Sequence, residues 1–413
     1  MSELYVVGVG MTHFGQHKDR TLEDMAGEAL NRALKDASCS VEDLGCAYYS
    51  GITNGLLQKQ TAIPGQVVLH KIGVQGIPVY NVESACASGS LGFNLALQSL
   101  RAGSCDVALA IGAEKMHIED KASMFKVFDG GWDVSSIEEN TKILLKPNPG
   151  FVAPEGSESD RPYSLFMKLY ASACINHMVK YGTTQRQIAA VCAKNHTHSV
   201  HNPYAQFQMP MTIEQVLGAP PITYPLTMPM CSPMSDGAAA VIVCNEDGLA
   251  RLGIDKKRAI RVAASVVRSA TTRSDEQPEL HCERLAAMEA YEIAGFGPDD
   301  IHVAEVHDAT AAGEIFHVEN LNFVDFGEGG PAAERGEFTI GGRLPVNPSG
   351  GLESKGHPIG ATGLAQIFEL VTQLRGEAGG RQVDGARHAL QENSGGTVGI
   401  EEAAVAVNIF TND

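Results

Sequence analysis

The stretch CASGSLGFNLALQSLRAG, residues 86–103, has a counterpart far along the chain in GATGLAQIFELVTQLRG, residues 360–376. The two stretches align Gly89 with Gly363 and place an arginine near the end of each. Each predicts a glycine-rich turn that leads into a long helix. We expect both helices to be largely buried, because their apolar residues leave little polar face. A repeat of this length indicates a duplicated fold.

A second pair of stretches follows the same plan. Residues 22–50 and 283–307 share helical spacing of apolar residues, a short polar turn and a strand-like run, with Ala33 matching Ala290 at an offset of 257. Each half also opens with an apolar run typical of a strand, at 4–10 and 259–267. This order, occurring twice, predicts an α/β protein of two similar units packed together. The alternative is a chance likeness of amphipathic segments, which two ordered matches disfavour.

The middle of the chain fits the repeat poorly. We therefore predict an N-terminal half from 1–116 and 231–257, a C-terminal half from 258–413, and an inserted loop domain, 117–230, of the kind that covers a substrate. Residues 235–245, SDGAAAVIVCN, are typical of a turn and a buried strand that closes the first half. Further elements are expected as short helices at 164–180 and 184–194 and a linker at 246–257.

Composition excludes several classes of function. A net charge of −18 without a basic stripe argues against nucleic acid as a partner, although a local patch could still bind coenzyme A. The nine cysteines are irregularly spaced without a CxxC pair, so neither disulfides nor a zinc site are expected. Neither a signal peptide nor an apolar run of membrane-spanning length occurs, so we expect a cytoplasmic protein with no membrane partner.

Cys86 is a candidate nucleophile. It lies where a strand-like run, 78–82, meets the first buried helix, and the positive end of that helix favours a thiolate. The small residues around it, including Ala85 and Gly89, leave room for an acyl group and free backbone N–H groups for an oxyanion. The alternative is a buried structural cysteine.

His357 is the candidate base. It stands between Gly356 and Pro358, a poor place for core filling, just ahead of the second buried helix. The duplication places it in a turn equivalent to the one that carries Cys86, so pseudo-symmetry would bring the two together. A cysteine beside a histidine is an activated-nucleophile arrangement. The alternative is a histidine in a surface turn.

His307 follows the apolar run 301–306 and is expected at the carboxyl end of a strand, where α/β proteins collect their sites. A second imidazole there could polarise a thioester carbonyl, the alternative being a histidine in a helix-cap region. Asp308 is expected to be structural, or to cap the helix that follows it.

Three further histidines, His196, His198 and His201, have spacing that resembles a metal site. Neither companion cysteines nor an HExxH frame accompanies them, and the stretch is polar. We therefore expect a solvated loop and no metal.

Four motifs together carry a family resemblance that covers almost the whole chain. They are SACASG around Cys86, SDGAAA at 235–240, the pair His307-Asp308, and GGLESKGHPIGATG at 350–363. In this order they resemble the thiolase superfamily, specifically the sterol-carrier-protein-type branch with its acetyl-CoA acetyltransferase-like members. The resemblance implies a duplicated five-layered α/β/α/β/α fold, a homodimer or dimer of dimers, and acyl-coenzyme A thioesters as substrates without a permanently bound cofactor.

The resemblance also implies roles for the candidate residues. Cys86 would take the acyl group and His357 would remove its proton. His307 would belong to one oxyanion hole, and backbone N–H groups near Cys86 and Gly396 would form another. The implied activity is that of an acyl-CoA C-acyltransferase, for thiolytic cleavage of a 3-ketoacyl-CoA or for a Claisen-type condensation. Coenzyme A would lie along the loop region between about 140 and 235.

Two departures leave alternatives open. Asn393 stands where many thiolases have a second cysteine, and Ala309 stands where the sterol-carrier branch has one. The remaining Cys-His-His set resembles that of the ketoacyl synthases. Two alternatives follow: a thiolase in which His307 or His357 moves the α-proton of the substrate, or an acyltransferase whose nucleophile needs no such base. Some thiolase-like proteins are retro-aldolases that work with a small zinc-ribbon/OB-fold partner, but they usually lack the nucleophile that Cys86 supplies. A non-catalytic binding role is a third alternative.

Overall fold

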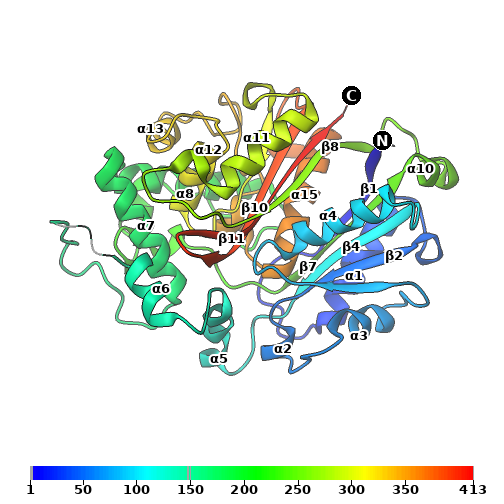
Figure 1. The fold of residues 1–413 in the computed structure, drawn as a ribbon, viewed down its shortest axis with the longest axis horizontal. Coiled ribbons are helices and arrows are strands. Elements are labelled where there is room, and N and C mark those ends of the chain that lie inside the picture. Colours follow the sequence, from blue (N-terminus) through cyan, green and yellow to red (C-terminus); the bar gives the residue numbers. More distant parts are fainter. Residues whose placement is uncertain (1–2, 147, 149, 413) are drawn as a thin grey trace.

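The computed structural model describes residues 3–146, 148 and 150–412. Nine of its described strands form one large mixed sheet (Figure 1). In order across the sheet they are β3 (Val79–Val82), β2 (Cys46–Ser50), β4 (Val107–Glu114), β7 (Gly237–Asn245), β1 (Leu4–Met11), β8 (Ile260–Ser269), β11 (Glu401–Thr411), β10 (His388–Val398) and β9 (Val303–Glu305).

The sheet is duplicated about its centre. There β1 and β8 pair antiparallel through Tyr5–Arg261 and Val6–Ile260. Outward from this junction, β1-β7-β4-β2 and β8-β11-β10-β9 show the same series of pairings: antiparallel, antiparallel, then parallel. The predicted duplication is therefore confirmed, and β3 is an additional strand at one edge.

Side chains of β7 show how the layers arise. Alternate residues of a strand point to opposite faces, so Val241 and Val243 pack on central helices while Ala240 and Ile242 pack on outer ones. The central layer holds α4 (Ser88–Arg101) and α15 (Thr362–Leu374) between the two halves of the sheet. The outer layers hold α1 (Leu22–Asp36) and α3 (Pro64–Lys71) on one side, and α11 (Cys282–Ala294) and α12 (Ala311–Asn320) on the other. The predicted five-layered α/β/α/β/α architecture is confirmed.

The two repeated helices differ in burial. Nearly all of α15 is buried, as its sequence predicts. Helix α4 is buried along one side, while Leu95 on its other side is exposed. Residues 246–257, expected as a linker, contain the short helix α10 (Glu246–Leu252), which Asn245 caps by accepting a hydrogen bond from Gly248 N–H.

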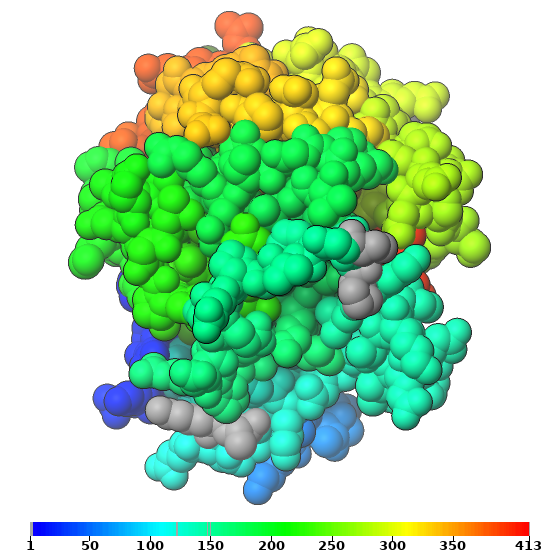
Figure 2. All heavy atoms as spheres, turned by 90° about the vertical axis from the view of Figure 1, so that its left-hand side faces the viewer, coloured from blue at the N-terminus to red at the C-terminus, as the bar shows by residue number. Residues whose placement is uncertain are grey.

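The region 117–230 is mostly helical. It contains α5 (Lys121–Lys126), α6 (Ile137–Leu144), α7 (Leu165–Tyr181), α8 (Gln185–His198), α9 (Ile213–Leu217) and the small hairpin β5 (Pro221–Thr223)-β6 (Leu226–Thr227). Figure 2 shows these teal and green segments making up much of the face at the left of Figure 1. Within the described ranges, no helix is long and apolar enough to cross a membrane. The domain boundaries proposed from the sequence, 117–230 for the loop domain and 258 for the start of the C-terminal half, stay a prediction.

The prediction of a solvated loop for the three histidines was wrong. Helix α8 continues beyond its predicted end at 194, and it buries His196 and His198, leaving only His201 of the three exposed. The ring of His198 is held by the Asn347 carbonyl (3.0 Å) and by Ile340 N–H (3.0 Å). These two histidines therefore fill the interface between α8 and the C-terminal half.

Close backbone contact between the halves gives a test of the fold. A Cβ added to Gly112 of β4 would lie 2.1 Å from the carbonyl oxygen of Gly360, which precedes α15. We expect Gly112→Ala to lower the free energy of unfolding by about 1–3 kcal/mol, because backbone cannot move aside as a flexible side chain can. Thermal and urea denaturation would measure this loss. Gly130→Ala is the control, since no atom of the described chain lies within 4 Å of its added Cβ; equal stabilities would contradict the proposed contact.

Candidate active site

Cys86 lies in a strained turn between β3 and α4. The preceding residue, Ala85, has φ of +47°, which non-glycine residues rarely adopt. The turn is held by the Glu83 carboxylate, which accepts a hydrogen bond from Ala85 N–H (2.8 Å), and by β10. A Cβ added to Gly395 of β10 would lie 2.6 Å from the Cys86 nitrogen. The turn thus presents a half-buried thiol at a fixed position.

His357 lies between α14 (Gly351–Lys355) and α15. Its backbone N–H donates to the Ser235 hydroxyl (3.0 Å), so the SDGAAA motif positions it directly. The next residue, Asp236, is buried and accepts hydrogen bonds from the backbone N–H groups of Met116 and His117. Burial alone would raise the pKa of Asp236, but hydrogen bonds from His117 and its neighbours hold it at about 2.

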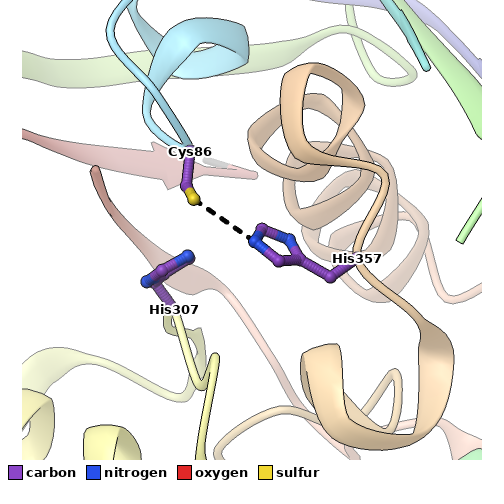
Figure 3. A group of neighbouring side chains, drawn as sticks. All are labelled: Cys86, His307 and His357. Atoms are coloured by element: carbon purple, nitrogen blue, oxygen red, sulfur yellow. Dashed lines mark hydrogen bonds between the residues drawn. The ribbon is translucent and has the colours of Figure 1, made fainter. Parts of the chain in front are cut away.

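The two turns meet as the duplication predicts (Figure 3). The Cys86 sulfur lies 3.3 Å from Nε2 of His357, although the two residues are 271 positions apart. His307 follows β9, and its ring centroid lies 5.2 Å from that of His357. Ligand atoms of all three side chains lie within 4.8 Å of one another. That spacing would also suit a metal ion, but the direct sulfur–nitrogen hydrogen bond favours acid–base chemistry.

Thr362 fixes the tautomer of His357. Its hydroxyl donates to the Pro358 carbonyl (3.0 Å), so its oxygen accepts from Nδ1–H of His357 (2.7 Å). The lone pair of His357 therefore lies on Nε2 and accepts the S–H of Cys86. Burial, with the positive charge of Lys355, lowers the pKa of His357 to about 3, so the ring is neutral and able to act as a base.

The expected preference for a thiolate is not observed. Burial, and then the Glu114 carboxyl, raises the pKa of the Cys86 thiol to about 12. Sequence reasoning weighed the helix terminus and missed this desolvation, because the depth of the turn depends on the opposite half of the molecule. At rest the site holds a thiol hydrogen-bonded to a neutral imidazole.

His307 is nearly fully buried at the carboxyl end of β9. Burial, with contributions from His357 and His317, lowers its pKa well below the usual range. Nδ1 lies 3.4 Å from the Ser394 hydroxyl, and Nε2 is covered from water with no hydrogen-bond partner among the described residues. A neutral ring with one unused nitrogen beside the thiol can donate to an oxyanion.

Asp308 is structural, but it does not cap the helix that follows it. Its carboxylate accepts the backbone N–H of Leu352 (2.8 Å) in the first turn of α14. It also accepts from the Asn195 side chain (3.0 Å). Asp308 therefore links the strand end that carries His307 to the segment that carries His357.

Comparison with known proteins agrees with this geometry. The model described as "Thiolase, N-terminal domain" matches residues 4–223, and "Thiolase C-terminal domain-like" matches 264–408. Acetyl-CoA acetyltransferase of Methanothermobacter thermautotrophicus is 39% identical over 100% of both chains. Sterol carrier protein 2 of Oryctolagus cuniculus is 37% identical over 96% of this chain and 70% of its own. The chain belongs to the thiolase family.

Other similar proteins extend the comparison. Benzoylsuccinyl-CoA thiolase subunit BbsB of Thauera aromatica is 34% identical over 92% of this chain and 91% of its own. Human mitochondrial 3-ketoacyl-CoA thiolase in complex with CoA shares the fold at a TM-score of 0.67, with 18% identity, over 99% and 98% of the two chains. The Ltp2-ChsH2(DUF35) aldolase does so at 0.76, with 21% identity, over 98% and 97%. This thiolase is an acyltransferase enzyme, and thiolases use coenzyme A thioesters as substrates.

Asn393 and Ala309, the two positions where the family resemblance leads us to expect a second cysteine, differ in their surroundings. Asn393 is fully buried and accepts a hydrogen bond from the Ser90 hydroxyl (2.8 Å). Ala309 lines the cavity that Cys86 opens into, and Asn393 is not among the described residues of its wall. Neither side chain can transfer a proton as a thiol does.

The cavity has a volume of about 1190 Å³ and brings the three site residues together with the helical region. Its wall is rich in large apolar side chains: Phe125, Phe128, Met167, Tyr170, Phe207, Met209, Met228 and Phe316. No lysine or arginine lines it within the described part of the chain. Sequence reasoning missed the wall residues Tyr170 and Glu353, and it placed His196 in a solvated loop instead of the cavity wall. Only Glu353, inside the GGLESKGHPIGATG motif, left a signal there, as an acid among small and apolar neighbours.

The role of Thr362 can be tested through the reactivity of Cys86. We expect Thr362→Val to slow alkylation of Cys86 by iodoacetamide at neutral pH about tenfold. Without the Thr362 hydroxyl, His357 is no longer held in the tautomer whose Nε2 accepts the thiol proton. Thr362→Ser retains the hydroxyl and should react like the wild type. Peptide mapping by mass spectrometry would follow the modified residue, and a Val variant that reacts at the wild-type rate would contradict the assignment of the tautomer.

Proposed function

We propose that this thiolase is an acyl-CoA C-acyltransferase that forms an acyl-enzyme on Cys86. The observation that supports this most strongly is the 3.3 Å contact between Cys86 Sγ and the lone pair of His357 Nε2. The proposed activity is thiolytic cleavage of a 3-ketoacyl-CoA, or the reverse Claisen-type condensation.

The first step transfers the acyl group to sulfur. His357 Nε2 takes the thiol proton as Cys86 Sγ attacks the thioester carbonyl, so a neutral pair becomes charged only during the attack. The new oxyanion is stabilised by His307 Nε2–H and by backbone N–H groups near Cys86 and Gly396. When the tetrahedral intermediate collapses, the C–S bond to coenzyme A breaks and His357 returns the proton to the leaving thiolate.

The carbon–carbon step must manage without a second cysteine. In thiolysis, Cys86 attacks the 3-keto carbonyl, the C2–C3 bond breaks, and acetyl-CoA leaves as an enolate that needs a proton. Coenzyme A then takes the acyl group from Cys86. His307 and His357 are the two imidazoles within 4.8 Å of the sulfur, so we assign this proton transfer to one of them. In condensation the same group removes the proton from acetyl-CoA.

The cavity wall indicates what kind of substrate binds, and the edge of the sheet indicates how the chain associates. Cavity-wall residues that expose apolar surface, Phe125, Phe207, Met209 and Met228, support a bulky acyl group. Because basic residues are missing from the described wall, the pantetheine arm would supply much of the coenzyme A binding, along residues of about 140–235. The unpaired edge of β3, with Tyr80 exposed, supports a homodimer.

Intact-mass measurement after incubation with acetyl-CoA or a medium-chain acyl-CoA tests the acyl-enzyme. We expect one acyl adduct on the wild type and none on Cys86→Ala, since the nucleophile is lost. Cys231→Ala is the matched control, because Cys231 lines the same cavity, and it should retain the adduct. An adduct that persists in Cys86→Ala, or that never forms on the wild type, would exclude the proposal.

A retro-aldolase is the second candidate, favoured by the loss of cysteine at both 309 and 393. The aldolase neighbour and the relative named as a subunit support a small zinc-ribbon/OB-fold partner for either activity. A lyase would cleave a β-hydroxyacyl-CoA to an aldehyde or ketone without any adduct on Cys86. Cleavage by Cys86→Ala at the wild-type rate would decide for the lyase.

A further inference from the structure

Besides His307 and Glu402, two residues on the wall of the cavity have buried polar atoms without a hydrogen-bond partner. The Glu353 side chain is 1% exposed, and neither carboxyl oxygen has a hydrogen bond within the described structure. His196 is 5% exposed, and its Nε2 has no bond to any described residue either. Both residues line the cavity that contains Cys86. Native proteins rarely leave such groups unsatisfied, and ligand sites are one place where they do.

The two groups belong to one patch of the wall. Helix α14, which carries Glu353, packs on α8, which carries His196. The Ser354 hydroxyl lies 3.3 Å from Nδ1 of His196. One helical turn before His196, the thiol of Cys192 lies beside the Glu353 carboxyl but donates to the Pro229 carbonyl (3.1 Å). The patch therefore has Nε2 of His196 and the carboxyl of Glu353 left over for a ligand.

The pKa shifts of both groups favour their neutral forms. Burial, and then the negative charges of Asp308 and Glu314, raises the pKa of Glu353 well above its usual range. Burial lowers the pKa of His196. A neutral carboxylic acid both donates and accepts a hydrogen bond, and Nε2 of a neutral imidazole adds one more donor or acceptor. No lysine or arginine side chain lines this wall among the described residues, so the patch matches an uncharged oxygen better than an anion.

We propose that Glu353 and His196 recognise a hydroxyl or keto oxygen on the acyl chain that Cys86 carries. This inference rests on the proposed acyl-enzyme and names its substrate class: an oxygenated acyl-CoA in preference to a plain hydrocarbon chain. Much of the rest of the wall is apolar and would accept the carbon skeleton of either. The patch makes the enzyme prefer the oxygenated chain, because an acyl chain without an oxygen leaves Glu353 and His196 without a hydrogen-bond partner.

Rates of acyl-enzyme formation, followed by quenched intact mass, test the proposal. The probes are octanoyl-CoA, a series of octanoyl-CoA thioesters with a single hydroxyl or keto oxygen at successive carbons beyond C3, and octanedioyl-CoA as an anionic chain. We expect the wild type to react with at least one oxygenated probe about tenfold faster than with octanoyl-CoA at limiting concentration, the effect of one well-made hydrogen bond. The anionic probe should react more slowly than octanoyl-CoA.

Variants assign the preference to the patch. Glu353→Leu should abolish it, so that oxygenated probes and octanoyl-CoA react at equal rates with this variant. Glu353→Gln should keep most of the preference because an amide still donates. Gln208→Leu, which removes an exposed polar group from the same cavity wall, is the matched control and should keep the preference.

Two results would overturn the inference. One is that the wild type reacts at the same rate with all the neutral probes. This result is measured on the wild type alone, so it does not depend on whether a variant folds. The other is a preference that survives in Glu353→Leu. If no probe forms an adduct on the wild type, the proposed acyl-enzyme itself fails, which is a distinguishable result.

Discussion

Close approach of backbone to backbone, where α4 and α15 meet at the centre of the molecule, is the constraint on which the site depends. Gly89, Gly112 and Gly395 each leave a space that a Cβ would fill within 3 Å of another segment's backbone. Those contacts bring the turn of Cys86 against the loop of the opposite half. A thiol and an imidazole 271 residues apart are thereby held at 3.3 Å.

Buried carboxylates supply the second level of positioning. Glu305, two residues before His307, accepts hydrogen bonds from Ser349 and from Lys355 (3.0 Å). Asp308, on the other side of His307, binds the backbone of α14. Burying charges is costly unless each is paired, and here both acids are paired with the segment that leads to His357. His307 and His357 are therefore fixed relative to each other through their neighbours in sequence.

Much of this arrangement could be read from the sequence, because duplication is visible in apolar spacing and in repeated glycines. The meeting of Cys86 with His357, and the place of His307 at a strand end, followed from pseudo-symmetry. Burial did not, since it depends on contacts between distant segments: His196 and His198 sit in a polar stretch yet are covered by the C-terminal half. For the same reason the thiol of Cys86 has a raised pKa despite lying near a helix terminus.

The electrostatics of Cys86, His307 and His357 explain how the site rests without a charged pair. His357 is neutral with its lone pair directed at sulfur, and His307 is neutral with an unused nitrogen, so the three site residues are uncharged before substrate arrives. Negative charge develops only as the sulfur of Cys86 attacks, when the thioester oxygen is present to accept part of it. In a cavity this apolar, a permanent thiolate–imidazolium pair would cost desolvation energy throughout the resting state, whereas the neutral pair defers that cost to the reaction step, where oxyanion donors offset it.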